Sequence, residues 1–165
     1  MPAGAAAAVV ALLDSQRLMS LAVNRPDGWP QVTTVGYVNE GLDLYFMVGR
    51  ESQKHANIAR DPRVSIAVRS ESDHGDAVGV SLAGRAVEVL DPARVESLNR
   101  MVTARYPGVS LYAPGGNSVA LYHVGPRIVS PVSVLGGRSK AQTYEFGEAL
   151  PAHEFTPHGE VSHLL

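Results

Sequence analysis

The chain contains no cysteine among its 165 residues. Disulfide bonds, catalytic thiolates and zinc–thiolate sites are therefore excluded. An excess of charge is missing as well, since 14 lysine and arginine residues are balanced by 16 acidic ones and no basic run stands out. Nucleic-acid-binding domains carry a basic patch or stripe, so the sequence predicts no nucleic-acid partner.

A long hydrophobic run is also missing. The one candidate for a targeting or membrane segment, Ala3 to Leu13 (AGAAAAVVALL), is too short to span a bilayer. It lacks the basic start and the cleavage site of a signal peptide. Alanine-rich sequence favours a helix, so we expect a first helix that packs on the rest of the domain. We expect a cytoplasmic protein without a membrane partner.

What is present is typical of a globular β protein. Hydrophobic residues make up 45% of the chain and charged residues 18%, enough for one domain with a real core. Several short runs rich in β-branched residues are separated by turn signals; they are 18–23, 31–38, 42–48, 63–68, 77–90, 119–124 and 127–134. Gly84 is expected to mark a bulge or a tight barrel corner, and Asp91 with Pro92 a helix start. The sequence predicts a mainly β fold, an antiparallel β-barrel of about six strands with helical additions.

The stretch from Gly36 to Val68 contains the most informative local pattern. A strand from Leu42 to Val48 leads through a polar corner into a short helix at about 53–59. Ser52 is a good N-cap, because its hydroxyl can accept from the free amides of the first turn. Pro62 disfavours helical geometry at the residue before it and ends the helix. Free N–H groups, the positive end of the helix dipole and Lys54 then meet at one point, which favours an anion and, above all, a phosphate.

This pattern resembles the pyridoxamine 5'-phosphate oxidase-like split β-barrels, which bind flavin. The resemblance rests on Ser52 and Lys54 at the helix start, on Asn57 three residues later, and on 61–65 (DPRVS) opening the next strand. It covers roughly residues 8 to 125 and implies a six-stranded split barrel, FMN as cofactor and a homodimer with flavin between the subunits. Residues 1–135 would form the flavin-binding domain, and 136–165 a tail with little regular structure, packed on the barrel or on a partner subunit.

The resemblance also implies where the cofactor binds. Ser52, Gln53, Lys54 and Asn57 would hold the phosphate. Relatives run the equivalent of 32–34 beneath the flavin ring, and positions matching 47 and 48 close the phosphate and ribityl side. The predicted cofactor-binding residues are Val32, Thr33, Thr34, Met47, Val48, Ser52, Gln53, Lys54 and Asn57. Since neighbouring strand residues point to opposite faces, at most one of Thr33 and Thr34 is expected to contact the ligand through its side chain.

Two family cations are replaced in this sequence. Many relatives carry an arginine immediately before the phosphate lysine, where this chain has Gln53. The pyridoxamine oxidases also begin the strand equivalent to 31–38 with an arginine, and this strand contains none. The chain further lacks their C-terminal signature, since its one tryptophan is Trp29. It is therefore not expected to be a true pyridoxamine phosphate oxidase.

Three functional hypotheses follow. The first is an FMN-dependent oxidoreductase of a small molecule, in which the flavin carries the electrons and no side chain is assigned as catalytic. The second is a deazaflavin (F-420)-dependent reductase. The third is a non-catalytic flavin- or haem-binding protein, which the two replaced cations favour.

The histidines give no metal site. His153, His158 and His163 recur at intervals of five, which is not the spacing of a helical ligand pair. Haem-degrading relatives use their C-terminal segment for axial ligation, so a tail histidine remains a haem alternative. His55 and His123 are expected to be ordinary surface residues or core residues with satisfied hydrogen bonds.

Overall fold

The computed structural model describes residues 1–71, 76–108 and 118–147. The elements in this part of the chain are, in order, α1 (Ala3–Ser15), β1 (Leu18–Asn24), β2 (Pro30–Gly36), β3 (Val38–Glu40), β4 (Asp43–Gly49), α2 (Gln53–Arg60), β5 (Arg63–Glu71), β6 (Ala77–Glu88), α3 (Pro92–Arg105), β7 (Val119–Leu135), β8 (Arg138–Ala141) and β9 (Tyr144–Glu145). None of these helices is long and apolar enough to cross a bilayer.

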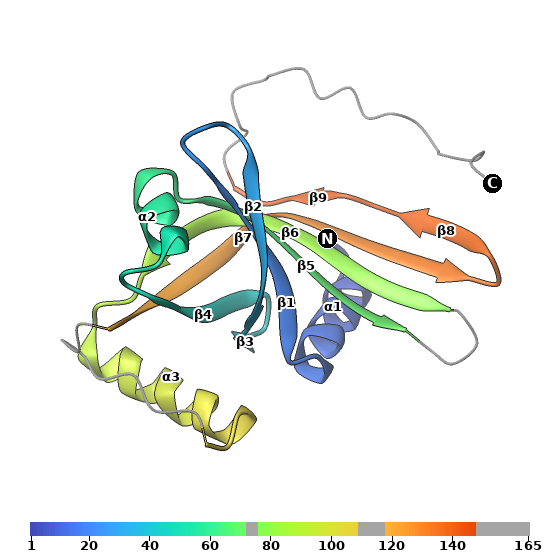
Figure 1. The fold of residues 1–165 in the computed structure, drawn as a ribbon. Helices are drawn as coiled ribbons and strands as arrows, with labels where there is room; N and C mark the ends of the chain where they lie inside the picture. The colour runs from blue at the N-terminus through green and yellow to red at the C-terminus, as the bar shows by residue number, and fades with distance from the viewer. Residues whose placement is uncertain (72–75, 109–117, 148–165) are drawn as a thin grey trace.

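All strands belong to one antiparallel sheet. Its order is β2-β1-β5-β6-β7-β4-β3, and β8 and β9 pair with β7. The strands at the two ends of this path, β2 and β3, are separated in the chain by Tyr37 alone. The sheet therefore has to curl back on itself, as Figure 1 shows. The predicted mainly β fold, a split barrel with helical additions, is confirmed.

The barrel core comes from strict alternation along the strands. In β1, Met19, Leu21 and Val23 are buried while the residues between them point outward. Strand β5 alternates in the same way. Helix α1 covers this core with Leu12 and Leu13, so the predicted first helix packs on the barrel as expected.

One predicted strand is broken. Residues 31–38 were expected to form one strand, but β2 ends at Gly36 and β3 begins at Val38. The cause is Tyr106 at the end of α3, whose hydroxyl accepts the Tyr37 N–H at 2.9 Å and lies 2.7 Å from the Tyr37 carbonyl oxygen. Because a side chain takes both backbone groups of residue 37, this residue has none left for a strand neighbour.

Conversely, two predicted strands are one. Residues 119–124 and 127–134 lie within the single strand β7. The register between β6 and β7 shifts at Ala83 and Gly84, opposite Pro126, so of the two alternatives expected at Gly84 the bulge is confirmed. A proline is tolerated at a bulge because the ladder hydrogen bonds are interrupted there. The segment from Gly136, expected to have little regular structure, contains two short strands that were not predicted, β8 and β9. The three tail histidines, His153, His158 and His163, lie outside the described residues.

Candidate functional site

The predicted helix start is present at α2. The Ser52 hydroxyl accepts from the backbone N–H of His55 at 3.2 Å and donates to the Gly49 carbonyl oxygen at 2.6 Å. This confirms Ser52 as the N-cap. Within the part of the chain that the structure describes, the backbone amides of Gln53 and Lys54 have no acceptor. They are therefore available to an anion.

Lys54 supplies the positive charge at this corner. Its side chain is half-buried, and this burial lowers the pKa of its ammonium group below the ordinary value for lysine. Over residues 1–71, 76–108 and 118–147, no carboxylate pairs with it and no acceptor is hydrogen-bonded to it. A partly desolvated cation without a counter-ion gains most from an added anion. Lys54 thus fits the phosphate of a cofactor.

A chain of side-chain amides occupies the neighbourhood of Lys54. Gln53 donates to the Asn57 side-chain oxygen at 3.1 Å, and Asn57 donates to the Gln31 side-chain oxygen at 3.1 Å. Asn57 is only 1% exposed, so its amide links α2 to β2 instead of facing solvent. Gln31 and Gln53 are the residues at which the family pattern has arginines. Two neutral amides joined through Asn57 therefore replace two separate cations.

Strand β2 presents its residues to two faces, as expected. Val32 and Thr34 point outward, and Val32 is 62% exposed. Thr33 is opposite Leu21 in the register and shares its inward face, with its hydroxyl oxygen buried and without a hydrogen-bond partner among the described residues. A ring lying on the outside of β2 would therefore meet the side chains of Val32 and Thr34 and only the backbone of Thr33.

The two predicted residues on β4 lie deeper than a ligand contact requires. Val48 is 6% exposed and belongs to the barrel core. Met47 is half-buried and packs against the smaller core cluster beneath α3. Both can contact a cofactor only through the backbone or, for Met47, through the remaining exposed part of its side chain.

Sequence reasoning missed the partners of the residues next to Lys54. The Tyr122 hydroxyl lies 2.9 Å from His55 Nδ1, and burial raises the pKa of that hydroxyl. The Arg50 guanidinium forms an ion pair with Glu88 on β6. His123 lies 2.6 Å from the Asp43 carboxylate. His55 and His123 thus each have a partner within the fold. Because these partners are far apart in the chain, no local sequence pattern predicts them.

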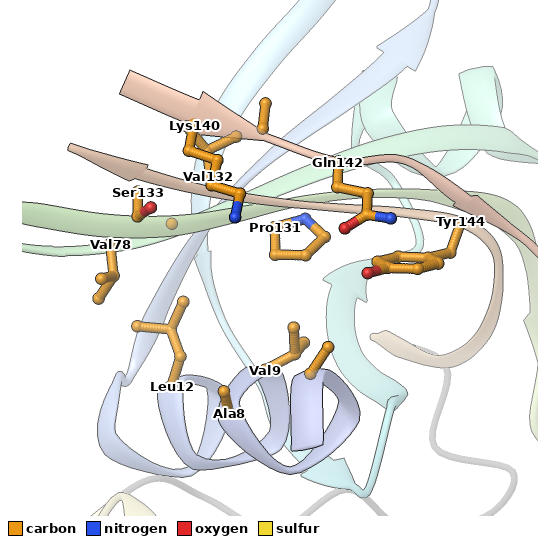
Figure 2. Close-up of a pocket in the computed structure, with 13 residues that line it drawn as sticks. Ala8, Val9, Leu12, Val78, Pro131, Val132, Ser133, Lys140, Gln142 and Tyr144 are labelled. Atoms are coloured by element: carbon orange, nitrogen blue, oxygen red, sulfur yellow. The ribbon is translucent and has the colours of Figure 1, made fainter. Parts of the chain in front are cut away.

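The structure also contains two surface hollows, and neither includes a predicted cofactor residue. One, of about 350 Å³, lies between α1 and the β7–β8 side of the sheet. Figure 2 shows Val9 and Leu12 rising from α1 toward Lys140, Gln142 and Tyr144. The other, of about 290 Å³, lies over β1, β5, β6 and β7. No group of three or more His, Asp or Glu side chains in the described residues is arranged for a metal ion.

Comparisons with known proteins agree with the geometry. The family model for pyridoxamine 5'-phosphate oxidase matches residues 5–130. Among curated proteins there is no significant match. Solved structures with the same fold include a FAD-binding protein from Mesorhizobium loti, with 21% identity over 81% of this chain and 95% of that one and a TM-score of 0.63. A heme-binding protein from Mycobacterium smegmatis has 21% identity over 88% of this chain and 59% of that one, with a TM-score of 0.64. A conserved protein from Mycobacterium tuberculosis has 22% identity over 93% of this chain and 94% of that one, with a TM-score of 0.64. At these identities the likeness shows the fold alone, whereas the family match covers most of the chain. The chain therefore belongs to the pyridoxamine 5'-phosphate oxidase-like family of split β-barrels.

Proposed function

We propose that this protein is a homodimeric, FMN-dependent oxidoreductase that acts on a small molecule. The observation that carries the proposal is Lys54, a half-buried ammonium group that has no counter-ion among the described residues, beside two amides at the start of α2 that have no acceptor there. A terminal phosphate would satisfy all three groups at once. The similarity in fold to a FAD-binding and a heme-binding protein supports a flavin or haem ligand.

In this proposal each part of the site has a separate task. Lys54 and the amides of Gln53 and Lys54 hold the phosphate. The side chains of Val32 and Thr34 point outward from β2, an end strand of the sheet path, and support the ring. The bound flavin supplies the electron or hydride transfer. The protein then needs only to bind, orient and exclude water, so no side chain is assigned as an acid or a base.

The outer face of the sheet supports the homodimer. Strand register places two rows of small side chains side by side across neighbouring strands. The rows are Thr34, Ser20, Ala67, Ser81 and Ser130, and Val32, Ala22, Ser65, Ala83 and Ile128. A flat face of small residues with exposed Leu18 at its edge suits close packing against a second sheet. Two copies packed on this face would bring Val32 next to the partner, and so place the flavin between subunits.

A second candidate is supported by the amide chain of Gln31, Asn57 and Gln53. With two neutral side chains at the family's arginine positions, Lys54 is the one cation among the residues predicted to hold the phosphate, which are Ser52, Gln53, Lys54 and Asn57. Such a corner would hold FMN less tightly than one with three cations. A deazaflavin (F-420)-dependent reductase, or a non-catalytic flavin- or haem-binding protein, would then be the function.

Absorbance spectroscopy with equilibrium titration separates these functions. The purified protein is titrated with FMN, F-420 and haemin, and the visible spectrum and flavin fluorescence are followed. FMN binding that saturates at one molecule per subunit supports the proposal, and reduction of bound FMN by a nicotinamide donor supports the oxidoreductase. Saturation by F-420 or haemin without FMN binding refutes the FMN assignment. Light scattering tests the dimer, and a monomer at micromolar concentration would contradict the intersubunit site.

A further inference from the structure

The hollow between α1 and the β7–β8 side of the sheet has an apolar floor. On the helix side it is lined by Ala5, Ala8, Val9 and Leu12. These positions are three and four residues apart, so they form one stripe along α1, and the stripe is about 10 Å long. Val78 on β6 also lines the hollow and is 44% exposed. The hollow therefore contains apolar surface that the described fold leaves open to solvent.

The opposite wall of the hollow carries three polar side chains. They are Lys140, Gln142 and Tyr144, every second residue along β8 and β9, so they share one face of this segment. The Gln142 N–H donates to the Pro131 carbonyl oxygen at 3.3 Å, and Tyr144 is the register partner of the buried Val129. The shared face is thus the one directed toward α1, as Figure 2 shows.

These three polar groups have no partner of their own. Over residues 1–71, 76–108 and 118–147, no carboxylate pairs with the Lys140 ammonium group, and neither the Gln142 amide nor the Tyr144 hydroxyl is hydrogen-bonded through its side chain. Lys140 and Gln142 are exposed and Tyr144 is half-buried, so a ligand can reach all three from solvent. Together they offer an ammonium group, an amide N–H and a hydroxyl to an acceptor above an apolar floor.

We propose that this hollow binds a small amphipathic carboxylate, a molecule with one carboxylate head and an aliphatic chain. The head binds the Lys140 ammonium group and accepts from the Gln142 amide and the Tyr144 hydroxyl. One cation with two neutral donors matches a single negative charge. The chain lies along the stripe on α1, where the small side chains of Ala5 and Ala8 leave room for it. A hollow of about 350 Å³ with an apolar lining and a few polar groups has the general character of a small-molecule site.

The hollow is separate from the proposed dimer face and from the proposed flavin site. It shares no residue with the two outward rows of small side chains or with the predicted cofactor residues. Helix α1 covers the inner side of the sheet, because Leu13 belongs to the same core cluster as Leu21 and Val129. The two rows lie on the outer side. Two copies packed on these rows would leave the α1 side uncovered, so the carboxylate site does not rest on the proposed function.

Calorimetric titration with octanoate tests the charge recognition, and octanamide is the uncharged probe of the same chain length. We expect octanoate to bind and octanamide to bind at least about tenfold more weakly. Lys140→Met should weaken octanoate binding about three- to tenfold, and Tyr144→Phe about threefold. The control for charge is Arg100→Met, which removes one cation from the exposed face of α3 and should leave the affinity unchanged.

Two further measurements test the place of the aliphatic chain. Hexanoate lacks two methylene groups and should bind about tenfold more weakly than octanoate. Ala8→Phe puts a large side chain into the hollow and should weaken octanoate binding at least about tenfold. Ala7→Phe is the matched control, because Ala7 is exposed on the same helix and does not line the hollow. Urea unfolding of both variants checks that they are folded.

Three outcomes would overturn the proposal. The first is equal binding of octanoate and octanamide, and the second is unchanged octanoate affinity in both Lys140→Met and Ala8→Phe. The third is no octanoate binding to the wild type; if Ala8→Phe alone then lowers the mass seen by light scattering, a second copy occupies the hollow instead. Lys54→Met separates this test from the proposed function, since it should weaken FMN binding and retain the wild-type affinity for octanoate.

Discussion

Replacing Lys54 by methionine removes the charge at the start of α2 and keeps most of the side-chain length. A hydrogen bond to a charged group contributes about 1.5–3 kcal/mol to binding. Because Lys54 is only half-buried, screening by water favours the lower part of this range. We therefore expect the FMN dissociation constant to rise roughly 10- to 30-fold, which corresponds to about 1.5–2 kcal/mol.

The assay is quenching of flavin fluorescence at two salt concentrations. Lys140 provides a matched control, because it is the chain's other lysine and lies on β8, away from the phosphate corner. Lys140→Met should leave the FMN dissociation constant unchanged. The difference between wild type and Lys54→Met should shrink as salt is raised, since the Debye length falls from about 10 Å at 0.1 M to about 3 Å at 1 M.

Stability supplies the result that would refute the reasoning. In the folded protein burial lowers the pKa of Lys54, so the charged form is disfavoured there relative to the unfolded chain. Removing that charge should leave the unfolding free energy of the cofactor-free protein unchanged or raise it. If Lys54→Met instead unfolds more easily in urea and binds FMN as well as wild type, Lys54 is a structural residue and the phosphate corner is misassigned.

Three further predictions concern the site and the fold. Gln53→Arg restores a family cation beside Lys54 and should tighten FMN binding about three- to tenfold in the same assay; weaker binding would show that the amide chain matters more than the charge. Tyr106→Phe leaves the Tyr37 backbone N–H without its acceptor and should cost about 1–3 kcal/mol in urea unfolding, whereas Tyr144→Phe, whose hydroxyl has no partner in the described residues, should cost little. Gly84→Ala would place a Cβ within 2.7 Å of a β7 carbonyl oxygen and should destabilise by about 1–3 kcal/mol; a wild-type midpoint would contradict the bulge geometry.

Local chemistry made the helices and their ends predictable. Ser52 and Asp91 cap α2 and α3 through their side chains, because each oxygen is within reach of an amide three residues away. The proline after α2 and the alanine-rich start of the chain act over similarly short distances. The runs that form β1 and β5 are equally local signals, since strand-forming residues gather there between turn residues.

The strand errors arose from contacts between residues far apart in the chain. Tyr106 interrupts the strand at Tyr37 from 69 positions away, and no property of 31–38 indicates that contact. Pro126, which has no N–H to donate, lies between the two predicted strands, and the bulge opposite Gly84 lets β7 continue through it. The segment 138–145 becomes a pair of strands because β7 offers it an edge, not because its composition favours strands.

The candidate site was predictable in its outline and not in its details. Ser52 and Lys54 follow from the helix start itself. Sequence spacing gave no indication that Asn57 would be buried against Gln31, or that Val48 would turn into the core. These depend on how α2 and β4 rest on the curled sheet, which is a property of the whole fold.

Strand β7 has a consequence for how the molecule opens. Its 17 residues pair with β6 on one side and with β4, β8 and β9, so this one strand joins both halves of the curled sheet. Partial opening that frees β7 would undo most of the sheet together, so its central amides should exchange with deuterium only through global unfolding. By the same reasoning the amides of β8 and β9, which pair with β7 alone, should exchange first. Local unfolding of these two strands should leave the rest of the sheet folded.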